Sequence, residues 1–187
     1  MIDRISQKAA AYLAGRSRAD REQEEVYAYG LNILLGESLQ VLVVLLIAFC
    51  LNLFYYTVAV CITFAAFRLF GGGPHLSTRW SCLLVSTAEI TGLSFLAAWP
   101  VPENILLALL LGSLSFILLA VYRWAPGGTS KKPLEDPLIR RRLKIKTLFA
   151  TVVWLLVSLY LLTNNQTRYS LALLLGAADA MFWVTPI

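Results

Sequence analysis

The chain has 187 residues, of which 58% are hydrophobic and only 14% are charged, and its net charge is +5. Soluble domains carry about a quarter charged residues, so this composition indicates a single integral membrane domain over residues 1–187. The length excludes a separate soluble catalytic module, and the three cysteines, an odd number, do not imply a disulfide framework.

The first 30 residues are mostly polar, but apolar positions recur at helical spacing, namely Ile2, Ile5, Ala9, Tyr12 and Leu13. This pattern predicts an amphipathic helix that lies on the membrane surface on the cytoplasmic side. A helix packed against the rest of the protein explains the same spacing equally well.

Six apolar runs follow this segment, at residues 31–53, 54–67, 83–99, 105–122, 147–162 and 169–184. A bilayer needs about 17–25 residues per transmembrane helix, so several runs are short but adequate. We therefore predict an all-α, polytopic membrane protein with a six-helix bundle over residues 31–184. The second run fits either a full crossing or a partly re-entrant segment.

The basic residues are distributed unevenly between the two sides of this topology. All of the 16 lysines and arginines except Arg168 fall on the side that carries both termini and two loops, at residues 68–82 and 123–146. Because basic loops stay in the cytoplasm, the pattern predicts a multi-pass cell-membrane protein with both termini cytoplasmic. The basic loop 123–146 is typical of an anchor for lipid headgroups, and less typical of a receptor for an acidic peptide. Nucleic acid is not an expected partner.

The short Gly-rich loop between spans two and three carries the residues that point to chemistry. Three consecutive glycines and a proline, residues 71–74, prevent a continuous helix. His75 is the only histidine, and Cys82 begins span three, where the positive end of a helix favours a thiolate. A neighbouring imidazole is the commonest base for a cysteine nucleophile. The pair predicts the active site of a membrane-embedded cysteine enzyme.

Ser86 and Glu89 follow Cys82 by four and seven residues, so all three lie on one face of the predicted span three. A polar face within a membrane bundle points inward. Taken singly, His75 is better explained as a solvated loop residue and Cys82 as an inert helix residue. The glycines before them and the polar face after them favour catalysis.

Three acids lie within apolar runs, namely Glu37, Glu89 and Asp179. Intramembrane acids are costly, and each of these is a candidate third member that orients His75. Arg68 either pairs with one of them or holds a substrate carboxylate or a developing oxyanion. One histidine and one nearby cysteine are too few ligands for zinc, so we expect no metal and no other cofactor.

These motifs resemble the accessory gene regulator protein B family, and the similarity covers nearly the whole chain. It rests on Arg68, Gly72-Gly73-Pro74-His75, Cys82-x-x-x-Ser86, Tyr122-x-x-Ala125-Pro126 and Lys131-Lys132-Pro133-Leu134. Members are integral membrane cysteine endopeptidases of Gram-positive bacteria. They remove the C-terminal tail of a small precursor peptide and help to cyclise it into a thiolactone or lactone used in quorum sensing.

The resemblance implies a role for each matching residue. Cys82 would be the nucleophile and His75 the general base. The supporting loop positions are Arg68, Gly72 and Gly73, and the substrate-binding basic loop contains Lys131 and Lys132. Leu76 and the triple glycine depart from the small-residue and mixed loops of relatives. The implied partner is a precursor peptide with an amphipathic leader and an acidic tail, and the resemblance also suggests a homodimer.

Two other functions fit the same residues. A small transporter or channel would use the inward-facing acids and no covalent chemistry, and would keep its function after Cys82→Ser. A purely hydrolytic membrane peptidase would use Cys82 but form no cyclic product.

Overall fold

The computed structural model describes residues 2–17, 19–73, 78–127 and 136–185. These ranges contain seven helices, α1 to α7, so the predicted all-α fold is confirmed for the described part of the chain. The chain divides into two compact units, Met1–Val44 and Leu45–Ile187.

In the first unit, α1 (Ile2–Ser17) packs through small residues rather than through its large apolar ones. Its buried positions are Ser6, Ala10 and Ala14, each four residues after the last. The larger side chains predicted to form an apolar face are instead exposed, by 49% for Ile5, 65% for Tyr12 and 44% for Leu13. An exposed apolar stripe on a short helix is typical of a helix that lies on a membrane surface.

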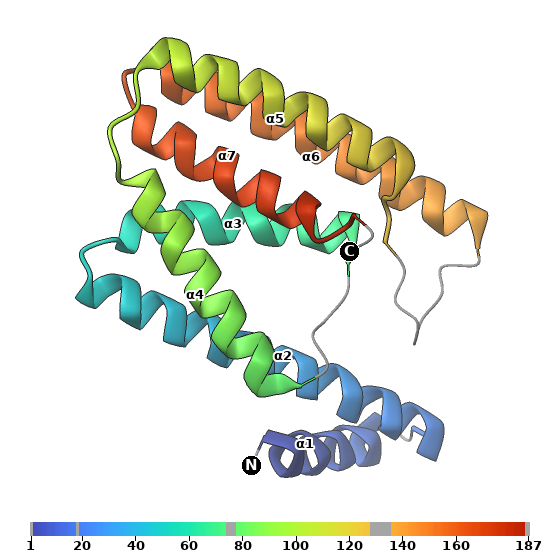
Figure 1. The fold of residues 1–187 in the computed structure, drawn as a ribbon. Coiled ribbons are helices and arrows are strands. Elements are labelled where there is room, and N and C mark those ends of the chain that lie inside the picture. Colours follow the sequence, from blue (N-terminus) through green and yellow to red (C-terminus); the bar gives the residue numbers. More distant parts are fainter. Residues whose placement is uncertain (1, 18, 74–77, 128–135, 186–187) are drawn as a thin grey trace. The chain divides into compact units, whose positions relative to one another are not determined.

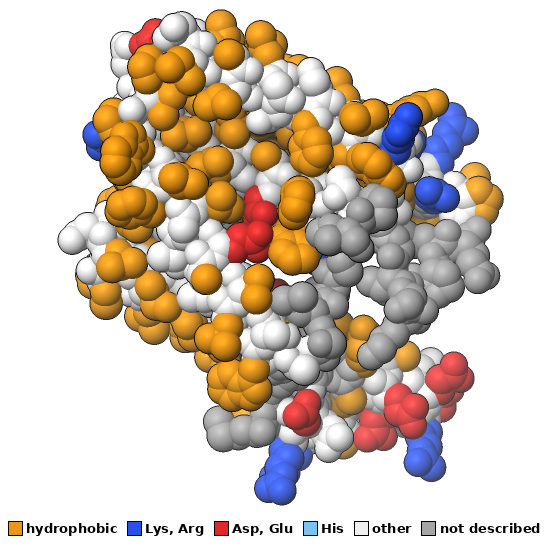
Figure 2. Space-filling view, viewed as in Figure 1, with side chains coloured by type: hydrophobic (Ala, Val, Ile, Leu, Met, Phe, Trp, Pro, Cys, Tyr) orange, Lys and Arg blue, Asp and Glu red, His pale blue; other side chains and the backbone are white. Residues whose placement is uncertain are grey.

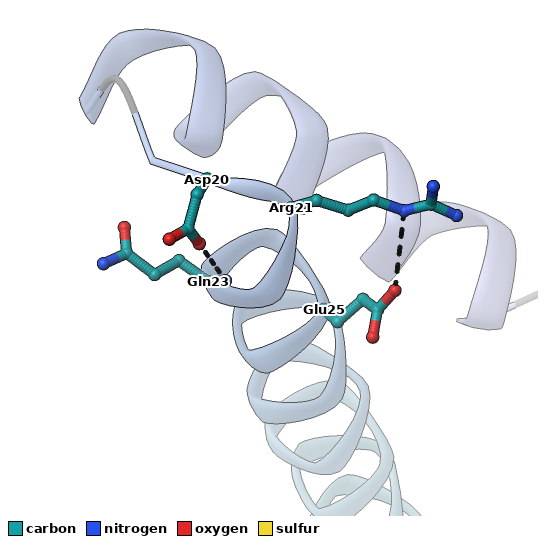
Figure 3. A network of polar contacts seen from close by, with 4 residues as sticks. All are labelled: Asp20, Arg21, Gln23 and Glu25. Carbon is teal, nitrogen blue, oxygen red and sulfur yellow. Dashed lines mark hydrogen bonds and ion pairs between the residues drawn. The ribbon is translucent and has the colours of Figure 1, made fainter.

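The second helix, α2 (Arg21–Cys50), begins well before the apolar run predicted at residues 31–53. Figure 3 shows how its polar first turn is closed: Oδ1 of Asp20 accepts the backbone N–H of Gln23 at 2.8 Å. Arg21 and Glu25, one helical turn apart, form an ion pair in which Nε of Arg21 lies 3.8 Å from Oε1 of Glu25. An N-cap of this kind stabilises a helix by about 1 kcal/mol, which explains why the polar segment is helical too.

The connection from α2 to α3 (Phe54–Gly71) is as short as the adjoining apolar runs predict. Asn52 makes this turn with a φ of 58°, a conformation that asparagine tolerates better than most residues. The backbone N–H of Leu53 donates to the carbonyl of Ala48 at 2.8 Å. α3 then continues as one unbroken helix of 18 residues.

In the second unit, α7 is the central helix (Figure 1). The remaining helices are α4 (Arg79–Ala97), α5 (Glu103–Arg123), α6 (Pro137–Thr163) and α7 (Thr167–Phe182). α7 packs against all four of α3, α4, α5 and α6. The predicted basic loop 123–146 is helical from residue 137 onward, because α6 begins at Pro137. Asp136 is the N-cap of this helix, and its Oδ1 accepts the N–H of Leu138 at 2.8 Å.

The core of this unit combines large apolar side chains with a few satisfied polar groups. Phe67 of α3 meets Trp154 of α6 edge-on, with ring centroids 6.2 Å apart. The indole N–H of Trp154 donates to the carbonyl of Leu173 on α7 at 3.0 Å. Such hydrogen bonds allow a polar group to be buried without an unpaired donor.

Gly176 allows α7 to approach α3 closely. A Cβ at this position would lie 2.6 Å from the carbonyl oxygen of Val60, a backbone atom that cannot turn aside. We expect Gly176→Ala to lower the stability by about 1–3 kcal/mol, the usual cost of overpacking. Thermal unfolding in detergent measures this, with Gly112→Ala as the control, because nothing lies within 4 Å of a Cβ there. Equal melting temperatures for the two variants would contradict the prediction.

Among the described residues, five helices are long and apolar enough to cross a membrane: α2, α3, α4 from Trp80, α5 and α6. On the face shown in Figure 2, hydrophobic side chains cover α5. Side chains of this kind, such as Leu107 and Leu111, are exposed, as expected where lipid rather than water is the neighbour. The pattern is that of a multi-pass membrane protein.

The sixth predicted span corresponds to α7, whose 16 residues give a helix about 24 Å long. The hydrocarbon core of a bilayer is about 30 Å thick. α7 is shorter than each of the five helices that are long enough to cross a membrane. The six-span topology therefore stays a prediction.

Candidate functional site

Cys82 lies in the first turn of α4, as the sequence predicts. Thr78 caps this helix: its Oγ1 accepts the backbone N–H of Ser81 at 3.2 Å, and its carbonyl accepts the N–H of Cys82 at 3.0 Å. The thiol therefore lies at the N-terminal end of α4, where the helix dipole is positive.

The polar face predicted for α4 begins at Cys82 and is partly buried. Sγ of Cys82 lies 4.0 Å from Oγ of Ser86, one turn along the helix. Glu89, a further turn on, is also half-buried. At this distance the Ser86 hydroxyl is a weak hydrogen-bond partner for sulfur, of the kind that favours one orientation of the thiol.

The Gly-rich loop starts where α3 ends, at Gly71. The N–H of Gly72 caps α3 by donating to the carbonyl of Arg68 at 3.0 Å, and Nη1 of Arg68 donates to the carbonyl of Gly72 at 3.2 Å. Gly72 and Gly73 have φ angles of 73° and 127°, which only glycine adopts readily. A Cβ at Gly73 would collide with the Arg68 guanidinium. Arg68 thus holds the loop backbone, a role that sequence alone did not assign.

The loop also contacts a segment far away in the sequence, immediately after α5. Gly72 and Gly127 form an isolated parallel bridge, and the N–H of Gly127 donates to the carbonyl of Gly71 at 2.8 Å. A Cβ at Gly72 would meet the carbonyl oxygen of Gly127. The sequence did not predict this contact, although the motif Tyr122-x-x-Ala125-Pro126 ends at the residue before Gly127.

Two of the three candidate acids are close together. Asp179 of α7 lies beside Glu89 of α4, near enough for a hydrogen bond between the two carboxyl groups, and within the electrostatic influence of Arg68. Among the described atoms, Oδ2 of Asp179 is buried without a hydrogen-bond partner. The third acid, Glu37, belongs to the first unit and is exposed on α2.

Trp183, which the sequence analysis did not single out, is the remaining member of this group. Its indole N–H donates to Oε1 of Glu89 at 3.0 Å. Its backbone carbonyl oxygen would lie 3.2 Å from a Cβ at Gly73. The only available signal in the sequence was an indole near the end of an apolar run, and this does not identify a partner.

Three predicted site residues, His75, Lys131 and Lys132, lie outside the described residues, so their roles stay predictions. Within the second unit, the described candidates form one group that includes Arg68, Gly72, Gly73, Glu89 and Asp179. Cys82 and Ser86 lie on the same helix as Glu89.

Comparison with known proteins now identifies the family. The sequence profile described as Accessory gene regulator B matches residues 6–185. This chain belongs to the accessory gene regulator B family. The predicted family resemblance is therefore confirmed, and it extends over α1 to α7.

Several relatives share this family at low sequence identity. Accessory gene regulator protein B of Staphylococcus saprophyticus is 28% identical, covering 92% of this chain and 88% of the relative. Accessory gene regulator protein B of Staphylococcus carnosus is 24% identical over 96% and 92% of the two chains. A putative AgrB-like protein of Listeria innocua is 29% identical over 80% and 72%. No solved structure matches the chain.

Proposed function

We propose that this protein is a membrane-embedded cysteine endopeptidase that removes the C-terminal tail of a small precursor peptide and promotes its cyclisation. The product would be a thiolactone or lactone signal of the kind that the family resemblance implies. The observation that carries the proposal is the position of Cys82, in the first turn of α4 at the start of its partly buried polar face, in a chain of the accessory gene regulator B family.

The first step is acyl transfer from the precursor to the enzyme. His75 accepts the proton of Cys82, and the thiolate attacks the scissile carbonyl carbon. The carbon–nitrogen bond breaks, the tail leaves as an amine that takes the proton back from His75, and a thioester links the peptide to Cys82. The half-buried surroundings of Cys82 and Ser86 support a site that contains little water, which protects the thioester from hydrolysis.

The second step closes the ring. A cysteine or serine side chain within the bound peptide gives its proton to His75 and attacks the carbonyl carbon of the thioester. The bond to Cys82 breaks, and the released sulfur of Cys82 takes the proton from His75. With a cysteine as attacker, one thioester replaces another, so this step is nearly balanced. Departure of the tail makes the overall reaction favourable. Lys131 and Lys132 are proposed to bind the acidic tail, and the exposed Arg140, Arg141 and Arg142 at the start of α6 add positive charge nearby in sequence.

The test is co-expression with the small precursor peptide encoded beside the gene, followed by mass spectrometry of the fragments. The expected products are a free tail and a core that is lighter than its linear form by one water. Hydroxylamine, which cleaves thioesters, should release the enzyme-bound core as a hydroxamate. A linear core without cyclic product would favour the hydrolytic peptidase, and export of the uncut peptide would favour the transporter.

The proposed orientation has a separate test at the two ends of α6. Asp136 caps the start of this helix and Asn164 its end, and both are exposed. In a variant without native cysteines, a membrane-impermeant maleimide added to intact cells should label Asn164→Cys and spare Asp136→Cys, because the basic end faces the cytoplasm. The reverse labelling would overturn the cytoplasmic assignment of both termini.

A further inference from the structure

Trp183, the residue directly after α7, lies between two parts of the candidate site. Its indole N–H donates to Oε1 of Glu89 at 3.0 Å, and Glu89 lies two turns after Cys82 on α4. Its carbonyl oxygen would lie 3.2 Å from a Cβ at Gly73. One residue thus approaches both the helix that carries the nucleophile and the Gly-rich loop.

The neighbours of Trp183 extend this contact to the rest of the loop. A Cβ at Gly71 would lie 3.4 Å from Sδ of Met181 and 3.6 Å from Cγ2 of Val184. A Cβ at Gly127 would lie 3.6 Å from Cγ1 of Val184. The end of α7 therefore packs against the end of α3, the Gly-rich loop and the segment after α5.

The hydrogen bond from Trp183 to Glu89 joins two residues 94 positions apart in the sequence. Trp183 is held in turn by its own helix, because its backbone N–H donates to the carbonyl of Asp179 at 3.2 Å. Asp179 also lies beside Glu89. A hydrogen bond from the half-buried indole to a carboxyl oxygen is more directional than apolar packing alone.

We infer that Trp183 is a positioning residue for the reaction at Cys82, fixing the Gly-rich loop against α4 through Glu89 and Gly73. The inference rests on the proposed function for the reaction that it supports. A displacement of about 1 Å between reacting groups can cost about 100-fold in rate, so a residue that never touches substrate can still control turnover.

The test uses a background with Cys50→Ala and Cys61→Ala, so that Cys82 is the only cysteine of the original three. Trp183→Phe keeps an aromatic ring and removes the N–H donor. The first measurement is the rate at which iodoacetamide alkylates Cys82 in membranes without any peptide. The second is kcat and KM for tail release. We expect the alkylation rate and kcat to fall about tenfold or more, with KM changed by about twofold at most.

The matched control is Trp154→Phe, which also removes an indole hydrogen bond, to the carbonyl of Leu173. It should lower thermal stability but leave the alkylation rate of Cys82 unchanged. Glu89→Ala removes the acceptor of the indole hydrogen bond and should lower the alkylation rate as much as Trp183→Phe does. The double variant Trp183→Phe with Glu89→Ala should be no slower than either single variant.

Alkylation of Trp183→Phe at the wild-type rate would overturn the inference. An equal loss of the Cys82 alkylation rate in Trp183→Phe and Trp154→Phe would also overturn it, because it would indicate general destabilisation. If the wild-type protein cleaves no precursor peptide, the proposed function fails. The alkylation rates of the variants still decide the role of Trp183, because they are measured without peptide.

Discussion

Replacement of Cys82 by alanine is expected to abolish tail release, with a loss on the order of 10⁴-fold or more, the size seen when a covalent nucleophile is removed. The reason is chemical: without the sulfur no thioester forms, and no neighbouring group replaces it. Ser86 lies one turn away, but a serine hydroxyl is a much weaker nucleophile than a cysteine thiolate. His75→Ala should also cause a large loss of tail release, because the Cys82 thiol would then lack its general base.

Mass spectrometry of the co-expressed peptide measures this result, and an epitope tag confirms equal amounts of each variant in the membrane. The matched controls are Cys50→Ala, at the exposed end of α2, and Cys61→Ala, within α3. Both should cleave at close to the wild-type rate. Undiminished tail release by Cys82→Ala would refute the proposed mechanism and leave the transporter as the better explanation.

Replacement of Gly72 by alanine is expected to cause the second largest loss. Gly72 has a φ of 73° and a ψ of −153°, a region that is essentially restricted to glycine, and its Cβ would collide with the carbonyl of Gly127. The backbone strain costs about 1–3 kcal/mol, and the collision forces the Gly-rich loop away from the segment after α5. Activity should fall about 100-fold or more, because the loop that precedes Cys82 is displaced.

The control for this variant is Gly92→Ala on α4. Nothing lies within 4 Å of a Cβ at Gly92, so the substitution adds helix propensity without a collision. Tail release and thermal unfolding in detergent should be measured for both. Full activity in Gly72→Ala would show that the bridge between Gly72 and Gly127 is not needed for the reaction.

Helix positions were largely predictable from the sequence, since long apolar runs have few alternatives in a membrane protein. The ends of the helices were harder to predict. α2 begins as early as Arg21 because the Asp20 cap and a polar first turn stabilise it, and a hydropathy pattern reveals neither of these features. α6 starts at Pro137 for the same reason, within a segment whose charges indicated a loop.

The site divides along similar lines. That Cys82 and Ser86 lie together on one face of α4 was predictable, because helical spacing places residues four apart on the same face. The grouping of Glu89 with Asp179 and Trp183 was not, because pairing between distant helices leaves no periodic signal in one sequence. The partners predicted for Arg68 did not include the carbonyl of Gly72. That contact depends on the backbone conformation of the loop, which the sequence does not reveal.

The central position of α7 has a consequence for biosynthesis. α7 follows α3, α4, α5 and α6 in the chain and packs against all four, so the ribosome completes these helices before their common partner exists. During that interval Glu89 lacks Trp183, and the Gly-rich loop lacks the side chains that pack against it. The candidate site should therefore be assembled only after α7 has been synthesised.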